Sequence, residues 1–310
     1  MIKNTDKKGL EFSFKVLFAI ILGAFILFLA IYAATRLIPS QSSGTSAALA
    51  KEIGVLLNPL ETGFESGRTS AIFTNTETRI YNDCNNFSDF GSQLIQVSQK
   101  TFNKWQAPGV QIEFQNKYIF SESYEEGTIF NIFSKPLEMP FKIADLVFLS
   151  SAEKSYCFVN PPASIKDEIE QLNQSNIRTE NCGIVPAKVR VCFSPGSDCD
   201  VNVGYNAGWV EKNNTRVYFA GNTLMYAAIF SSSKIYECQA QRLAMRAEEL
   251  ASIYHKKQGL VGSQGCLSNL DISSFAQSLG SYDDSSDLGA LYSQAVLIDN
   301  ENSISLCRMW

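Results

Sequence analysis

The sequence predicts an α+β protein with one N-terminal transmembrane helix, a mostly antiparallel β ectodomain and a helical C-terminal part. Three observations lead to this prediction. A long apolar run lies near the N-terminus, apolar and polar residues alternate through residues 70–224, and a helical spacing of apolar residues takes over after residue 225. The 310 residues are enough to bury a sizeable core in one large or two small domains.

The apolar run from Val16 to Ala34 has the length of a membrane-spanning helix. Its 19 uncharged residues would extend for about 28 Å as a helix, close to the roughly 30 Å of a bilayer's hydrocarbon core. Lys15 and Arg36 bracket the run. We therefore expect a transmembrane helix that contacts the lipid bilayer through residues 16–34.

The charges that flank this run predict its orientation. Four lysines precede it and only Arg36 follows it closely, so the positive-inside rule places the N-terminus in the cytoplasm and residues 37–310 outside. A cleaved secretory signal is the alternative, with Ala33-Ala34 as a small-residue site for cleavage. The expected location is the cell membrane.

All cysteines follow the apolar run, on the side predicted to be oxidising. An even number in that position predicts up to four disulfides, whose pairing the spacing leaves open. The candidates are Cys84, Cys157, Cys182, Cys192, Cys199, Cys238, Cys266 and Cys307. No Cys-x2-Cys pair occurs, so we expect no metal site. At least one of the last three must pair outside that trio or stay free.

Strands are expected through residues 70–224. Period-two alternation at Ile95–Val97, Ile112–Phe114 and Val189–Phe193 is typical of half-buried antiparallel strands. The more continuous apolar run Ile143–Leu149 predicts a central strand. Pro161-Pro162 leads into a helix that interrupts the sheet at residues 164–172.

Helices are expected elsewhere from capping residues and helical spacing. They cover residues 45–57, 231–257, 270–279 and 287–298. Gln258-Gly259 is expected to end the longest of them, at residues 231–257. These patterns divide the chain into a cytoplasmic leader (1–15), a transmembrane helix (16–36), a linker and helix (37–69), a β-rich ectodomain (70–224) and a helical part packed on it (225–310).

Charge excludes one class of partner. The net charge is −5 and the isoelectric point is about 5.1. Five of the 26 basic and two of the 31 acidic residues lie in residues 1–36, so the remainder carries a net charge of −8. A domain this acidic repels polyanions, and we expect no nucleic-acid binding. The expected partner is another envelope protein or a second copy of the chain.

A catalytic set is hard to find, and we expect neither an enzyme nor a cofactor. His255 is the only histidine, and it suits the C-terminal end of a helix. No nucleotide-binding glycine loop occurs. Glu125-Glu126 or Asp198 with Asp200 could form a carboxylate pair of a hydrolase, although adjacent acids in loops are usually solvated. The acidic segment 283–287 is most simply a solvated capping loop, with a calcium site as the alternative.

Three Asn-x-Ser/Thr triplets could carry N-linked glycans on the outer side of a membrane. They begin at Asn86, Asn173 and Asn213. Triplets of this kind also arise by chance in a chain rich in Asn and Ser.

Residues Asp6-Lys-Lys-Gly-Leu-Glu11, followed closely by an apolar helix, resemble the leader (class III) of archaeal type IV pilin-like precursors. In that family a peptidase cuts after the Gly or Ala that follows the charged residues. The resemblance implies cleavage after Gly9, with Leu10 as the new N-terminus.

Part of the C-terminal region is similar to a group of uncharacterised archaeal single-pass membrane proteins. The matching residues are Tyr226-Ala-Ala-Ile-Phe-Ser231, Ile235-Tyr-Glu-Cys-Gln239, Arg242-Leu243 and Cys307-Arg-Met-Trp310. This resemblance implies an archaeal envelope location and no particular activity.

Three functional hypotheses follow from the sequence. The first is a membrane-anchored, disulfide-stabilised extracytoplasmic protein that acts in envelope structure or protein–protein interaction. The second is a pilin-like filament subunit processed after Gly9. The third is an extracellular hydrolase that uses paired carboxylates.

Overall fold

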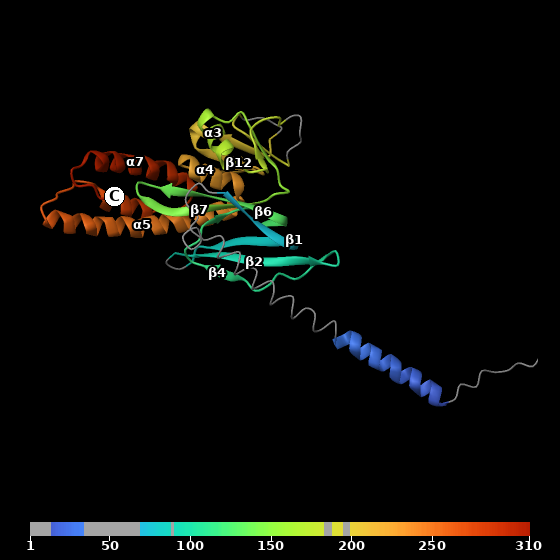
Figure 1. Ribbon diagram of the computed structural model, residues 1–310. Helices are drawn as coiled ribbons and strands as arrows, with labels where there is room; N and C mark the ends of the chain where they lie inside the picture. The colour runs from blue at the N-terminus through green and yellow to red at the C-terminus, as the bar shows by residue number, and fades with distance from the viewer. Residues whose placement is uncertain (1–13, 34–68, 88–89, 183–187, 195–198) are drawn as a thin grey trace, which may run out of the picture.

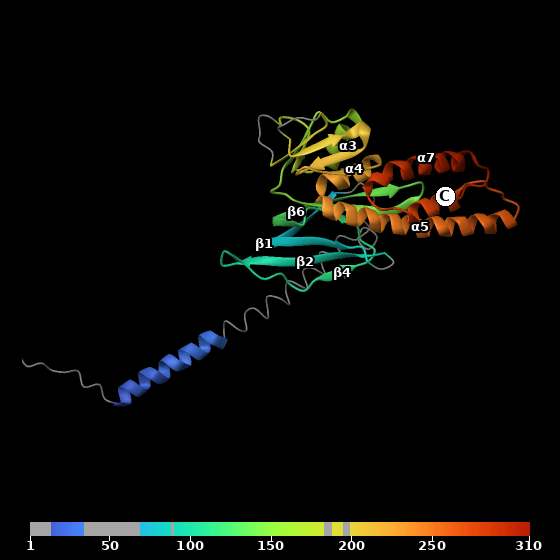
Figure 2. The same cartoon turned by 180° about the vertical axis from the view of Figure 1, so that it is seen from behind.

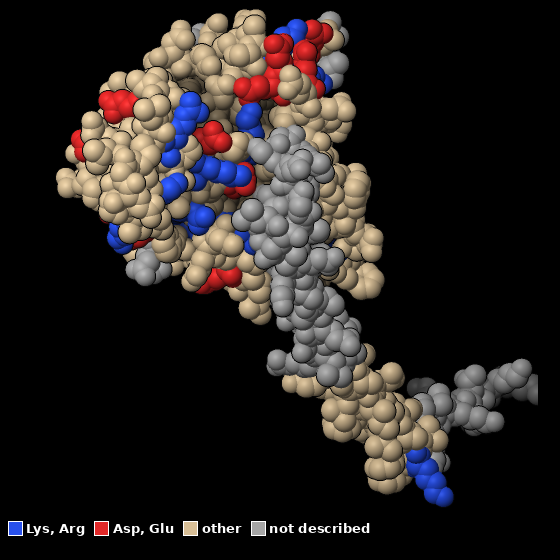
Figure 3. Space-filling model, turned by 60° about the vertical axis from the view of Figure 1, so that its left-hand side comes forward, with Lys and Arg blue, Asp and Glu red and all other residues tan. Residues whose placement is uncertain are grey.

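The computed structural model describes residues 14–33, 69–87, 90–182, 188–194 and 199–310 (Figure 1). Within these ranges one helix, Phe14–Ala33, has the length and apolar composition needed to cross a membrane. Its 20 residues make no buried contact with the rest of the chain, and its surface is uncharged except near its start (Figure 3). Such a helix suits a membrane anchor or a signal sequence. The helix expected at residues 45–57 and most of the expected linker lie outside the described residues.

The larger of two sheets has the strand order β3-β2-β1-β6-β7-β5, and β4 pairs with β2. Its strands are β1 (Thr69–Asn85), β2 (Ser92–Thr101), β3 (Lys104–Trp105), β4 (Ile112–Phe114), β5 (Ile119–Phe120), β6 (Tyr124–Glu138) and β7 (Lys142–Ser151). All pairs are antiparallel except β5 with β7. The alternating segments at 95–97 and 112–114 are strands, and the run at 143–149 lies between two neighbours, as predicted.

The smaller sheet corrects the expectation of a mostly antiparallel ectodomain. Its order is β13-β12-β11-β10-β8-β9, and β9, β8, β10 and β11 run parallel to one another. Its strands are β8 (Tyr156–Val159), β9 (Ile177–Arg178), β10 (Val189–Cys192), β11 (Val201–Gly204), β12 (Trp209–Lys212) and β13 (Thr215–Tyr218). The alternation at 189–193 correctly indicates a strand, but period two reports the faces of a strand and not its direction.

Five further helices complete the described fold: α3 (Ala163–Leu172), α4 (Gly221–Phe230), α5 (Ser233–Ser263), α6 (Ile272–Gly280) and α7 (Leu288–Ile304). Short 3-10 helices cover Tyr205–Ala207 (η1) and Ser285–Asp287 (η2). Helix α3 is confirmed, with Ile165, Ile169 and Leu172 buried. The helical part begins at Gly221, earlier than expected. Helix α5 continues through Gln258 and Gly259, because Gly259 lies in open space and one glycine costs only about 1 kcal/mol.

Helix α4 fills the space between the two sheets. It contacts β6 and β7 of the larger sheet and β12 of the smaller one, and Figures 1 and 2 show it between these layers. Every residue from Leu224 to Phe230 is buried, because both faces of the helix meet a sheet. Phe133 stacks on Phe148 with ring centroids 4.4 Å apart, and Phe230 packs edge-on against Phe133. Much of the aromatic content is therefore core.

Four disulfides join the eight cysteines, as the sequence predicts. Their pairs are Cys84–Cys238, Cys157–Cys182, Cys192–Cys199 and Cys266–Cys307. The first ties β1 to α5 over a sequence separation of 154 residues, so Cys238 pairs outside the C-terminal trio. The last ties the chain just after α5 to the chain after α7.

A buried polar network holds α5 against the larger sheet. The guanidinium of Arg242 is fully buried and donates to the carbonyl oxygens of Phe90 (3.0 Å), Gln115 (2.8 Å) and Lys117 (2.9 Å). It also donates to the Gln239 side chain at 2.7 Å. From there the network continues through Gln93, Asn82 and Ser121. We call these five side chains the Arg242 network.

Candidate functional site

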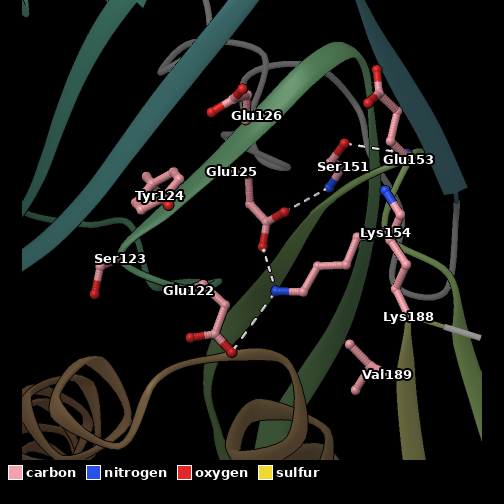
Figure 4. A pocket seen from close by; sticks show the side chains of 10 residues that line it. All are labelled: Glu122, Ser123, Tyr124, Glu125, Glu126, Ser151, Glu153, Lys154, Lys188 and Val189. Atoms are coloured by element: carbon pink, nitrogen blue, oxygen red, sulfur yellow. Dashed lines mark hydrogen bonds and ion pairs between the residues drawn. The ribbon is translucent and has the colours of Figure 1, made fainter.

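The strongest candidate site is a cavity of about 600 Å³ where the two sheets meet (Figure 4). Its walls come from the segment that opens β6, the end of β7, the β7–β8 turn and the start of β10. Its lining residues are Glu122, Ser123, Tyr124, Glu125, Glu126, Ser151, Glu153, Lys154, Lys188 and Val189. Four carboxylates and two ammonium groups make this cavity mainly acidic.

The register of β6 separates the two adjacent glutamates. Glu125 lies opposite Ile80 of β1 and Glu126 lies opposite Arg79, so the alternation of the strand sends the two carboxylates to opposite faces. Glu125 is only 3% exposed, whereas Glu126 forms an ion pair with Arg79 at 2.6 Å. Glu125 and Glu126 therefore do not face each other as a carboxylate pair, and they lie in a paired strand and not in a solvated loop.

The real neighbours of Glu125 come from other elements. Its Oε2 atom accepts a hydrogen bond from the Ser151 backbone at 3.0 Å, and its Oε1 lies 3.4 Å from Lys154 Nζ. Figure 4 shows Lys154 between Glu125 and Glu122, whose Oε1 is 3.9 Å from the ammonium. Burial raises the pKa of Glu125, and Lys154 and the Ser151 amide oppose the rise.

A close approach of two strands makes this arrangement possible. Gly127 follows the glutamates in β6, and a Cβ atom there would lie 2.8 Å from Ser151 Oγ. A larger residue there would have to displace the Ser151 hydroxyl, and glycine avoids this contact. The absent side chain therefore helps to bring the Ser151 amide to Glu125.

A second lysine joins the cluster from the smaller sheet. Lys212 Nζ lies 3.2 Å from Glu122 Oε1 and donates to the backbone oxygens of Ile229 (2.9 Å) and Ser231 at the C-terminal end of α4. Burial lowers the pKa of Lys212, and Glu122 opposes that change. A cation is favoured at the C-terminal end of a helix, where the helix dipole is negative. Opposite charges therefore alternate along an ion cluster formed by Glu125, Lys154, Glu122 and Lys212.

The ion cluster presents only part of itself to the cavity. All three protons of Lys212 have acceptors, and both oxygens of Glu125 are engaged. The side chains of Lys154 and Glu122 remain 26% and 33% exposed. These two groups can meet a ligand, while Glu125 and Lys212 hold them in place.

The other candidate residues lie elsewhere. Asp200 is exposed and accepts from the Arg190 amide at 2.7 Å, and Asp198 lies outside the described residues. His255 is exposed on α5. In the acidic segment, Asp284 caps η2, and no group of three metal-ligating side chains occurs among the described residues. Gly9 and Leu10 precede the described part of the chain.

The three candidate glycosylation sites differ in exposure. Asn173 follows α3 and Asn213 lies in the turn between β12 and β13, and both are exposed with a positive φ. Asn86 is half-buried and its amide donates to the Gln241 side chain. Modification at any of the three stays a prediction.

Sequence reasoning missed most of this site. Glu122, Lys154 and Lys212 are ordinary charged residues spread over about 90 positions, and no local pattern marks them. Among the lining residues only Glu125 and Glu126 were candidates, and they were considered as a pair with each other. Comparison with protein-family models, with curated proteins and with solved structures finds no match. The geometry of the site must therefore carry the functional argument.

Proposed function

We propose that this protein is a membrane-anchored extracytoplasmic binding protein whose acidic cavity holds a basic side chain of an envelope partner. The observation that carries the proposal is the ion cluster opening into the cavity. Burying charges costs several kcal/mol per ion unless they are paired, so a partly open cluster of this kind favours a functional role over a purely structural one. Four glutamates against two lysines in the lining favour a cationic group.

Two features support the proposed location. The helix Phe14–Ala33 is long enough to anchor the chain, with four lysines before or at its start and only Arg36 closely after its end. All eight cysteines follow it and all are paired, which suits an oxidising compartment. Tyr124, which is 51% exposed, offers an aromatic contact at the rim of the cavity, and tyrosine is enriched at protein interfaces.

Site-directed photocrosslinking tests the proposal. A benzophenone amino acid replaces Tyr124 at the cavity, and in a matched control it replaces Phe102, which is 97% exposed in the β2–β3 turn. In native membranes we expect a crosslinked protein from position 124 and not from position 102. The crosslink should weaken in the Glu122→Gln variant. Identical products from both positions, or none from position 124, would contradict the proposal.

One observation favours a hydrolase as the second candidate. Glu122 and Glu125 both face Lys154 in an open cavity, and the pKa of Glu125 is raised, as expected of a general acid. In this reading Glu125 would act as the general acid, after release of its contact with Lys154, and Glu122 would be the second carboxylate. Hydrolysis of a glycoside or ester substrate by the full chain, lost in the Glu125→Gln variant, would support it. A binding protein would show crosslinking without turnover.

The filament hypothesis rests on the leader alone and stays a prediction. Mass spectrometry of the protein from its native membranes would test it directly. A mature chain that begins at Leu10 would show pilin-type processing, whereas an intact N-terminus would leave a simple anchor.

A further inference from the structure

A second cavity, of about 400 Å³, lies in the smaller sheet and differs in chemistry from the first. Its described lining contains no charged side chain. Aromatic, amide, proline and small residues make up its walls: Asn160, Pro161, Pro162, Phe193, Val203, Gly204, Tyr205, Asn206, Ala207 and Trp209. We call it the neutral cavity.

The neutral cavity lies where the topology of a parallel sheet opens a crevice. Its residues directly follow the carboxyl ends of β8, β10 and β11. From β8 the chain passes through α3 to β9 on one side and then returns to β10 on the other side. Loops that leave neighbouring parallel strands in opposite directions leave a gap between them, and ligands of open α/β sheets bind at this point.

The aromatic side of the neutral cavity is held rigidly. The indole of Trp209 lies directly over Gly204, where any Cβ atom would come within 2.1 Å of the ring. The guanidinium of Arg216 lies 4.2 Å from the indole centroid. Tyr205 hydrogen-bonds to Asn222 at 3.1 Å, and its ring lies 6.2 Å from that of Phe193. Gly204 and Arg216 thus already contact the indole of Trp209, and the rings of Tyr205 and Phe193 give a ligand a preformed aromatic wall, which lowers the entropic cost of binding.

The polar side offers two free amides. Asn160 and Asn206 are exposed, and neither side chain hydrogen-bonds to the described residues. An amide both donates and accepts, as a hydroxyl does, so these groups suit a ligand that carries hydroxyls. No lysine or arginine belongs to the described lining, and nearby Arg216 is already paired with Glu211 at 2.7 Å. This disfavours phosphate groups and nucleotides, which need cationic partners.

We propose that the neutral cavity binds a neutral saccharide. The C–H groups on one face of a sugar ring pack against aromatic side chains, whose faces carry negative charge density, while its hydroxyls meet the two amides. Proline-rich peptides also dock on aromatic grooves. Such grooves recognise the prolines of the peptide and give no role to the amides of Asn160 and Asn206. This proposal concerns a different site from the acidic cavity and does not depend on it.

Titration calorimetry of the full chain in lipid nanodiscs tests the proposal, because nanodiscs avoid glycoside detergents. The probes are maltose, cellobiose and N,N′-diacetylchitobiose, each used up to about 10 mM, above the Kd of a weak millimolar site. We expect at least one disaccharide to bind. The Asn206→Ala and Tyr205→Ala variants should each bind it about tenfold more weakly, corresponding to one lost contact.

Controls separate the neutral cavity from other surfaces. Asn206 is exposed, so its substitution should not affect folding even if that of Tyr205 does. The Phe102→Ala variant alters an exposed aromatic residue on the larger sheet and should bind as the unaltered chain does. Failure of all three sugars to bind would overturn the proposal, as would equal weakening by Phe102→Ala. Binding of a polyproline peptide in place of sugars would overturn it in favour of peptide recognition.

Discussion

Two regions of this protein bury charge, and they do so in different ways. The Arg242 network holds one cation that is satisfied by three backbone carbonyls and a glutamine, with no carboxylate among these partners. The ion cluster holds two cations and two anions in alternation and opens into a cavity. A closed network with fixed acceptors can only hold the fold together, whereas a partly exposed one keeps groups free for a ligand.

The largest expected effect comes from breaking the Arg242 network. The Arg242→Met variant would remove the donor to the carbonyl oxygens of Phe90, Gln115 and Lys117, of which the bond to the Lys117 carbonyl is fully buried. We expect it to lose about 3–5 kcal/mol of unfolding free energy, measured by urea unfolding of the full chain in detergent. The exposed Arg308→Met variant serves as the control and should change stability by less than about 0.5 kcal/mol. Equal effects would show that burial of the guanidinium is unimportant.

The disulfide beside this network should come next. Replacing Cys84 and Cys238 by Ser removes a link that closes 154 residues, and we expect a loss of about 2–4 kcal/mol. The Cys192–Cys199 pair closes only seven residues, so its removal should cost less, because the entropy of loop closure rises with loop length. The two double variants are compared by thermal unfolding. A larger loss from the short loop would contradict this ordering.

Within the ion cluster, Lys212 is the member most involved in folding. The Lys212→Met variant would leave Ile229 and Ser231 carbonyls at the end of α4 without their donor, and Glu122 without its nearest cation. We expect a loss of about 1–3 kcal/mol by urea unfolding. The Lys166→Met variant breaks an exposed ion pair with Glu180 and should cost less than about 1 kcal/mol. If both variants lose the same stability, Lys212 is no more structural than a surface lysine.

The smallest effect is a change in pH dependence at Glu125. Burial raises its pKa above the ordinary 4.5, so the folded chain binds more protons than the unfolded chain in the window above that value. The contribution of Glu125 to stability is therefore fully present below pH 4.5 and is lost as pH rises through the folded-state pKa. The slope cannot exceed about 1.4 kcal/mol per pH unit for one proton.

The Glu125→Gln variant lacks this titration. Subtracting its unfolding free energies from those of the unaltered chain, between about pH 4 and pH 8, should leave a difference that falls with rising pH. Burial also raises the pKa of Glu237, but that group is common to both proteins and cancels. A difference that is flat or rises with pH would show that Glu125 is not held in a raised-pKa environment.

Local patterns in the sequence were enough to predict the apolar helix, the disulfide-bonded state of the cysteines, helix α3 and strands such as β2, β4 and β7. These features depend on spacing along a short stretch of chain, or on the count and placement of one residue type. The same patterns misjudged the direction of β10 and the end of α5. Strand direction depends on neighbours that are distant in sequence, and an exposed glycine need not end a helix that is held elsewhere by packing.

Neither cavity could be predicted from the sequence, for the same reason. The ion cluster unites Glu125 and Lys212, from strands of the two sheets, with Glu122 and Lys154, from connecting segments, and each is unremarkable in its local segment. The neutral cavity unites three loops that only the parallel order of β8, β10 and β11 brings together. Sequence by itself determined an apolar helix, paired cysteines and much of the secondary structure, because these follow from local composition and periodicity. Tertiary structure decided which charges and aromatic rings meet, because those contacts depend on long-range strand pairing and on the packing of α4 between the sheets.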